Sequence, residues 1–116
     1  MTEEEVLQKT NRINLLFDFY QQLLTEKQQM FLKHYFHDDY SLGEIASEFQ
    51  ISRQAVYEHI KRAESVLEEY EAKLRLLAKH EERQELLERL RRFETELPEE
   101  STALFRAITE RLSELD

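Results

Sequence analysis

The sequence predicts an all-α protein, and three observations support this prediction. Turn-forming residues are scarce, because the 116 residues include one Gly and one Pro, too few for a β-sandwich or a Gly-rich nucleotide site. Glu, Lys, Arg, Gln and Leu are abundant, as in helical proteins. Apolar residues recur three and four positions apart, which is the period of an amphipathic helix. We expect a core of three or four helices that includes a helix-turn-helix, followed by a helical C-terminal extension.

Three capping boxes and one single cap mark the starts of helices in the N-terminal half. The boxes pair Thr2 with Glu5, Thr25 with Gln28 and Ser41 with Glu44, and the single cap is Ser52. We therefore expect a helix at about 3–24 and a second that ends in the polar stretch 37–40. A short third helix runs to about Phe49, and a fourth follows Ser52.

A heptad pattern follows the fourth cap. From Val56 to Leu77 the apolar positions alternate steps of three and four, which predicts one long helix. The apolar residues of this pattern form a seam along the helix. The seam packs on the N-terminal helices or pairs with a second copy of the chain, so a homodimer is one expectation. The run Lys79–Glu85 has no apolar residue and is either a bend or a solvated stretch.

The C-terminal third has a second apolar face and then a last helix. The face resumes from Leu86 to Leu97, Pro98 ends that helix, and an amphipathic segment follows at about 99–114. These patterns predict two parts. Residues 1–64 hold the N-terminal helices and the helix-turn-helix, and residues 65–116 form a helical extension that packs on them or forms a dimer interface.

Residues 41–64 have the pattern of a helix-turn-helix. Apolar or small residues occupy the positions where two short crossed helices meet: Ile45, Ala46, Phe49, Ile51, Ala55, Val56 and Ile60. Ala46 is small because the two helices approach each other closely there. Gln50 occupies the turn position where Gly is common, and a left-handed conformation there would cost about 1 kcal/mol.

The outward face of the second helix of this unit is the predicted recognition surface. It carries Arg53, Gln54, Tyr57, Lys61 and Arg62, which could contact phosphates, base edges or acidic side chains. The acidic residues Glu44, Glu48 and Glu58 oppose binding to DNA. Residues 41–64 carry 3 basic and 4 acidic residues within a chain of net charge -9, which predicts weak generic affinity for nucleic acid.

Other functional classes have little support in the sequence. Without cysteine a disulfide framework or thiolate metal site is excluded. His34, His37 and the acidic pair after them are better interpreted as helix-end and loop residues than as metal ligands. The carboxylates alternate with Lys and Arg at the spacing of intrahelical pairs. We therefore expect no enzyme, no catalytic residues, no metal site and no cofactor.

The N-terminus, Met1-Thr2-Glu3-Glu4-Glu5, lacks the basic and apolar regions of a signal peptide, and no apolar run reaches membrane-spanning length. We therefore expect a cytoplasmic protein without membrane insertion.

Two stretches of the sequence resemble known bacterial proteins. Leu24–Phe36 and Ser41–Ala63 resemble the region of sigma factors that reads the promoter −35 element. Together with Asn11–Tyr20 and Ile51–Arg62 they look like the YlxM family, a likeness that spans about residues 1–97. The resemblance implies a bacterial protein with a fold similar to sigma region 4. It also implies a role in the signal recognition particle pathway, to which the family is assigned because its genes lie beside that of the particle's protein component.

The leading functional expectation follows from this resemblance. It is a regulatory accessory protein that binds the particle's protein or RNA component through the helix-turn-helix. The alternative is a DNA-binding transcriptional regulator that uses the same helix in a major groove, as a dimer over two half-sites. A third interpretation keeps the helix-turn-helix as a scaffold, with the acidic C-terminal half engaging a basic protein.

Overall fold

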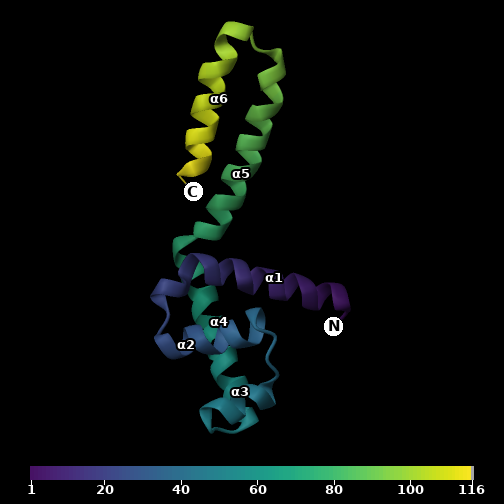
Figure 1. Cartoon of the computed structure of the whole chain (residues 1–116), viewed down its shortest axis with the longest axis vertical. Helices are drawn as coiled ribbons and strands as arrows, with labels where there is room; N and C mark the ends of the chain where they lie inside the picture. Colours follow the sequence, from purple (N-terminus) through teal and green to yellow (C-terminus); the bar gives the residue numbers. More distant parts are fainter. Residues whose placement is uncertain (116) are drawn as a thin grey trace. The chain divides into compact units, whose positions relative to one another are not determined.

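A computed structural model describes residues 1–115 of the chain and confirms the all-α prediction. Every regular element in the described residues is helical (Figure 1). The chain divides into two compact units, residues 1–75 and residues 76–116, of which the structure describes the second as far as Leu115.

The first unit contains four α-helices and two short helical turns. They are α1 (Glu3–Tyr20), the 3₁₀ turn η1 (Gln21–Leu23), α2 (Glu26–Leu32), the π-helical turn η2 (Lys33–His37), α3 (Leu42–Phe49) and α4 (Arg53–Leu74). All three capping boxes form, with both reciprocal hydrogen bonds in each. Ser52 caps α4, because its hydroxyl accepts a hydrogen bond from Ala55 N–H at 3.0 Å. The starts of the helices are therefore fixed by the local signals that predicted them.

The ends of the first two helices differ in detail from the prediction. α1 gives way to η1 after Tyr20, four residues before the predicted end at about residue 24. The Gln29 side chain contributes to this end, because its amide donates hydrogen bonds to the carbonyls of Gln21 at 2.7 Å and Leu24 at 3.3 Å. After α2 the backbone widens into η2, and Asp39 then adopts a left-handed conformation with φ of 62°.

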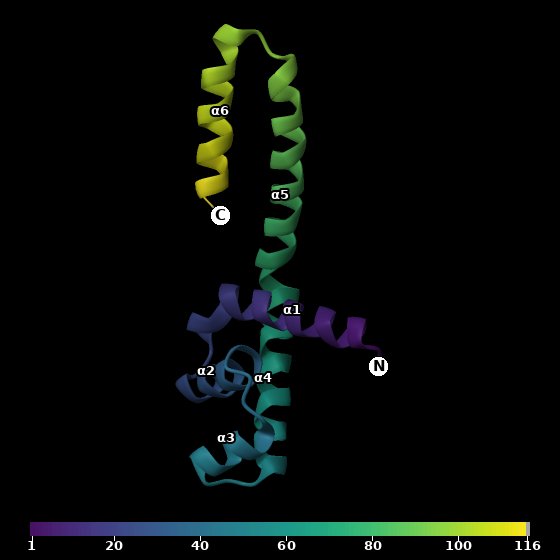
Figure 2. The ribbon, with the colours of Figure 1, turned by 45° about the vertical axis from the view of Figure 1, so that its right-hand side comes forward.

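One face of α4 forms the centre of the core. Helices α1, α2 and α3 all pack against α4, and Figure 2 shows them gathered around it. On α4 this face is formed by Val56, Ile60, Ala63 and Leu67. The opposing N-terminal segments contribute Ile13, Leu16, Phe17, Tyr20, Leu24, Phe31, Leu32, Ile45 and Ala46. The apolar seam from Val56 to Leu67 is thus covered by the chain's own N-terminal helices.

A buried polar contact joins the first and fourth helices within this core. Tyr20 is completely buried, and its hydroxyl donates a hydrogen bond of 2.6 Å to Glu71 Oε1. Tyr70 adds a second link, because its hydroxyl donates to the Leu23 carbonyl at 3.2 Å. Such partners are required because a buried polar group without one destabilises the fold.

The predicted long helix through Leu77 is wrong. α4 ends at Leu74, and Arg75 takes a left-handed conformation, with φ of 55° and its N–H donating to the Glu71 carbonyl at 2.8 Å. No Gly or Pro marks this end, so the pattern of apolar residues did not reveal it. The run Lys79–Glu85 lies inside the next helix, and its charged residues are exposed. Of the two interpretations of this run, the solvated stretch is the one confirmed.

The expected boundary after residue 64 falls inside α4, because that helix continues as part of the core as far as Leu67 and Glu71. The structure places the division between the units at Arg75.

The second unit is a helical hairpin. It contains α5 (Leu76–Phe93), the 3₁₀ turn η3 (Glu94–Glu96) and α6 (Glu99–Glu114). Helices α5 and α6 pack against each other and run antiparallel (Figure 1). Pro98 precedes α6, as predicted, and Arg106 Nε donates to Glu94 Oε1 at 2.8 Å across the hairpin.

Replacing Gln50 with Gly tests the turn. Gln50 has φ of 57°, which Gly adopts without the steric cost that a side chain imposes. We expect Gln50→Gly to raise the free energy of unfolding by about 1 kcal/mol, measured by urea titration. The matched control Gln54→Gly removes the same side chain from inside α4 and should lower it. A loss of stability in Gln50→Gly similar to that of the control would contradict this account of the turn.

Candidate recognition surface

The helix-turn-helix forms as predicted and sets the direction of α4. Ile45 and Ala46 of α3 are buried against α4. Gln50 turns the chain, and Ile51 N–H donates a hydrogen bond of 3.1 Å to the Ala46 carbonyl. Ser52 then caps α4. Because the buried side of α4 is fixed by this packing, its opposite side faces outward.

The five predicted surface residues all lie on the first three turns of α4. Arg53, Gln54, Tyr57 and Arg62 are exposed, and Lys61 is half-buried. Arg53, Tyr57 and Lys61 are spaced four residues apart and form one row along the helix. The Lys61 ammonium lies 5.5 Å from the centre of the Tyr57 ring, in the range of a cation–π contact. Arg53, Gln54, Tyr57 and Lys61 thus lie along one side of α4 and Arg62 lies farther around the helix, and the five residues are here called the recognition surface.

Several neighbours restrain this surface. Gln54 Nε2 donates a weak hydrogen bond of 3.4 Å to Glu58 Oε1. The Arg53 side chain lies over Gly43 of α3, where a Cβ would come within 3.9 Å of Arg53 Nε. Among the described ion pairs, none includes Arg53 or Arg62. These two guanidinium groups are accordingly the cations of the surface best able to meet an anionic partner.

The structure adds two residues that the sequence did not predict, Lys9 of α1 and Glu64 of α4. The Glu64 carboxylate lies 3.6 Å from Lys61 Nζ and 3.8 Å from Lys9 Nζ. The neighbouring Lys61 amine lowers the pKa of Lys9, an effect that the Glu64 charge opposes, and within the same group the pKa of Lys61 is raised by Lys9 and by Glu64. One carboxylate thus balances two lysines beside the recognition surface, and Lys9 reaches this group only through the packing of α1 on α4.

A hollow lies next to this charged group. A cavity of about 170 Å³ is lined by Met1, Val6, Lys9, Thr10, Tyr35, Phe36, Leu42, Tyr57, Ile60, Lys61 and Glu64. A shallower depression is lined by Leu42, Arg53, Gln54 and Tyr57. Because Leu42 and Tyr57 line both, the two hollows adjoin. The recognition surface therefore combines cations with an apolar recess into which a partner group could insert.

The histidines lie in separate environments. His34 stacks on Tyr40 with ring centres 4.9 Å apart, and its Nδ1 is 3.1 Å from Asp38 Oδ2. His37 instead meets the edge of Phe17 at 5.4 Å. The described residues contain no group of three or more His, Asp or Glu side chains arranged to hold a metal ion.

His59 stacks on Phe31, with ring centres 4.9 Å apart and planes 6° from parallel. Its pKa lies below the ordinary value of a histidine because burial disfavours the imidazolium, and the charges of Lys27 and Arg62 act in the same direction. Glu58 opposes these effects. Over a range of pH just below the ordinary pKa of histidine, His59 is therefore neutral in the folded chain, whereas the same residue in an unfolded chain already binds a proton.

Within residues 1–115, no helix has the length and apolar composition needed to cross a membrane.

Comparisons with known proteins identify similar chains. Residues 7–106 match the model of a family described as "Putative helix-turn-helix protein, YlxM / p13 like", UPF0122. A UPF0122 protein of an Exiguobacterium species is 56% identical over 102 residues, which cover 88% of this chain and 94% of the relative. One from Halalkalibacterium halodurans is 63% identical over 86 residues, covering 74% and 79%. One from Bacillus pumilus is 51% identical over 110 residues, covering 95% and 98%.

The lowered pKa of His59 makes stability depend on pH. As the pH falls below about 6.5, the unfolded chain binds a proton at this residue before the folded chain does. The contribution of His59 to stability is therefore present above that pH and is lost as the pH falls towards the folded-state pKa. We expect His59→Phe, which keeps a ring on Phe31, to lose less unfolding free energy than the wild type between pH 7.5 and pH 5. Equal losses in the two proteins, measured by denaturant titration, would contradict this assignment.

Proposed function

Because this chain belongs to the UPF0122 family of YlxM/p13-like helix-turn-helix proteins, we propose that it is a regulatory accessory protein of the signal recognition particle pathway. It would bind the particle's protein or RNA component through the recognition surface. The observation that supports this docking role best is the row of cationic and aromatic side chains on α4, exposed at Arg53 and Tyr57, next to an apolar recess.

Each residue of the surface suits a defined contact. Arg53 and Arg62 present planar guanidinium groups, which pair with phosphates or carboxylates through two parallel hydrogen bonds. Tyr57 is 45% exposed and offers a ring face for a base or an apolar side chain. Lys61 lies over that ring and adds a positive charge beside it.

The charge balance favours a structured partner over generic nucleic-acid binding. Residues 41–64 carry 3 basic and 4 acidic residues, so long-range attraction to a polyanion is weak. If Arg53, Lys61 and Arg62 each neutralise one phosphate, the logarithm of the affinity should fall with that of the salt concentration with a slope of about −2 to −3. Specific short-range contacts must then supply most of the affinity.

A second candidate function is sequence-specific DNA binding. In helix-turn-helix proteins the N-terminal residues of the second helix contact base edges in the major groove. Arg53 and Gln54 occupy the first two positions of α4, and both residue types read bases by paired hydrogen bonds. This function would use the same surface on a different ligand.

Removing the two guanidinium groups tests the docking proposal. We expect the double variant Arg53→Ala/Arg62→Ala to bind the reconstituted particle at least tenfold more weakly than the wild type, because charge-assisted contacts are lost. The matched control Arg89→Ala/Arg92→Ala removes two exposed arginines of α5 and should bind like the wild type. Isothermal titration calorimetry at moderate salt measures both, with the particle's protein alone and its RNA alone as further ligands.

Either of two outcomes would refute this proposal. The first is that the wild type does not bind the particle at micromolar protein, and the second is that the two double variants weaken binding to the particle equally. Tight binding to one duplex DNA sequence, with none to the particle or its components, would support the second function instead.

A further inference from the structure

The α5–α6 hairpin has little core of its own. Among its described residues, the buried side chains are Leu77, Leu87 and Thr109. The unit comprises 41 residues, a size at which a chain usually needs a disulfide, a metal or association to fold stably. The chain has no cysteine, and the described residues hold no metal-binding cluster.

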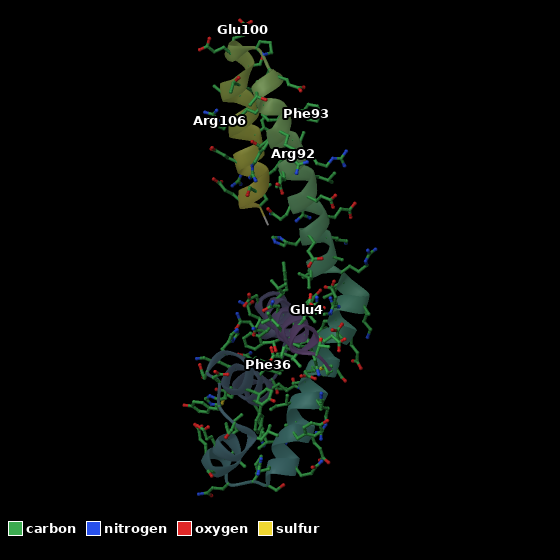
Figure 3. All side chains as sticks on the ribbon, turned by 90° about the vertical axis from the view of Figure 1, so that its right-hand side faces the viewer. Glu4, Phe36, Arg92, Phe93, Glu100 and Arg106 are labelled. Atoms are coloured by element: carbon green, nitrogen blue, oxygen red, sulfur yellow. The ribbon has the colours of Figure 1, made fainter. Side chains whose placement is uncertain are left out.

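Large apolar side chains lie instead on the outside of the hairpin. On α5 they are Leu86, Leu90 and Phe93, and on α6 and just after it Leu104, Ile108, Leu112 and Leu115. Between 39% and 67% of each residue is exposed. The members of each set are three or four positions apart, so each set forms a single stripe along its helix. Figure 3 shows Phe93 pointing away from α6.

The two stripes lie on the same side of the hairpin. Successive residues of an α-helix are 100° apart, so Leu90 lies about 80° to 110° around α5 from the side of that helix that packs on α6. Ile108 lies at a similar angle from the side of α6 that packs on α5, measured in the same direction of rotation about its own helix axis. Two antiparallel helices are related by an approximate two-fold axis that is perpendicular to the plane containing both helices. Rotation about this axis exchanges the helices but does not exchange the two sides of that plane, so residues at matching angles on the two helices lie on the same side of the hairpin. The stripes therefore form one apolar face, which contains no charged residue between Leu86 and Leu97 or along α6.

We propose that this face binds the same face of a second copy of the chain, which gives a dimer held by a four-helix bundle. Two stripes of similar length on antiparallel helices are self-complementary under a two-fold rotation, as an isologous interface requires. A face without charges brings no like charges together when it pairs with itself, although the whole chain carries a net charge of -9.

The exposed area is sufficient for such a dimer. With roughly 90 Å² exposed on each of the seven side chains, the face offers about 600 Å² per chain. The aliphatic parts of flanking arginines and glutamates extend this area towards the ~800 Å² that each partner contributes to an interface of standard size. A continuous apolar face of more than a few hundred Å² is itself unusual on a monomer.

This dimer does not use the Val56–Leu67 seam, which is covered by α1, α2 and α3. Its interface residues belong to α5 and α6 and the segment just after α6, and none of them is a residue of the recognition surface on α4. Each dimer would therefore carry two copies of that surface.

Sedimentation equilibrium of the full chain tests the proposal directly. Across the micromolar to submillimolar range, the wild type should approach twice the chain mass of 14.1 kDa. Ile108→Glu and Leu90→Glu each place a charge in the apolar interface and should raise the dissociation constant at least tenfold. Ile108→Ala should raise it less, and it preserves the helix because Ala has the highest helix propensity. The matched control Ala103→Glu adds the same charge on the opposite, exposed side of α6 and should leave the constant unchanged.

Three results would overturn the proposal. The first is a wild type that stays at the mass of one chain throughout, as it would if the N-terminal unit or an unrelated protein covered the face. The second is a dimer that neither glutamate variant weakens. The third is a dimer that Ala103→Glu weakens as much as Ile108→Glu does.

Discussion

The fold depends on one constraint, which is that three other helices pack against the same face of α4. Val56, Ile60, Ala63 and Leu67 are almost completely buried, and α1, α2 and α3 meet along them. Ala63 has no large side chain, so it allows close approach at the middle of the helix. Because this face is fully occupied, the exposed residues of the same turns lie on the other sides of the helix. The core and the recognition surface thus share one helix, and the packing of the first sets the direction of the second.

Much of this fold was predictable because its signals are local. The three capping boxes and the Ser52 cap fix the starts of helices, and the spacing of apolar residues separates the buried side of α4 from Arg53 and Tyr57. The left-handed break at Arg75 was not predictable, since the heptad pattern runs through it without a Gly or Pro. The sequence also did not predict that Lys9 lies beside the recognition surface, because its contact with Glu64 joins residues 55 positions apart in the sequence. The apolar recess depends on the same packing of α1 on α4.

The two units of the chain differ in how they obtain stability. In the first, apolar side chains from four helices bury one another, and the Tyr20 hydroxyl and the Glu71 carboxylate satisfy each other within that core. In the second, the interface between α5 and α6 contains few large side chains, while Leu90, Phe93 and Ile108 lie outside it. An apolar stripe that faces water contributes nothing to folding until something covers it. The proposed partner recognition uses the first unit, which has a complete core, and the proposed self-association uses the second, which has an uncovered apolar face.

Hydrogen exchange of the full chain at two protein concentrations, below and above dimer formation, tests this division most directly. If the N-terminal unit folds around α4 without help, amides in its core should be equally protected at both concentrations. If the hairpin depends on a second copy, protection within α5 and α6 should rise clearly with concentration. Protection of the hairpin that does not change with concentration, or a parallel rise in both units, would contradict the account.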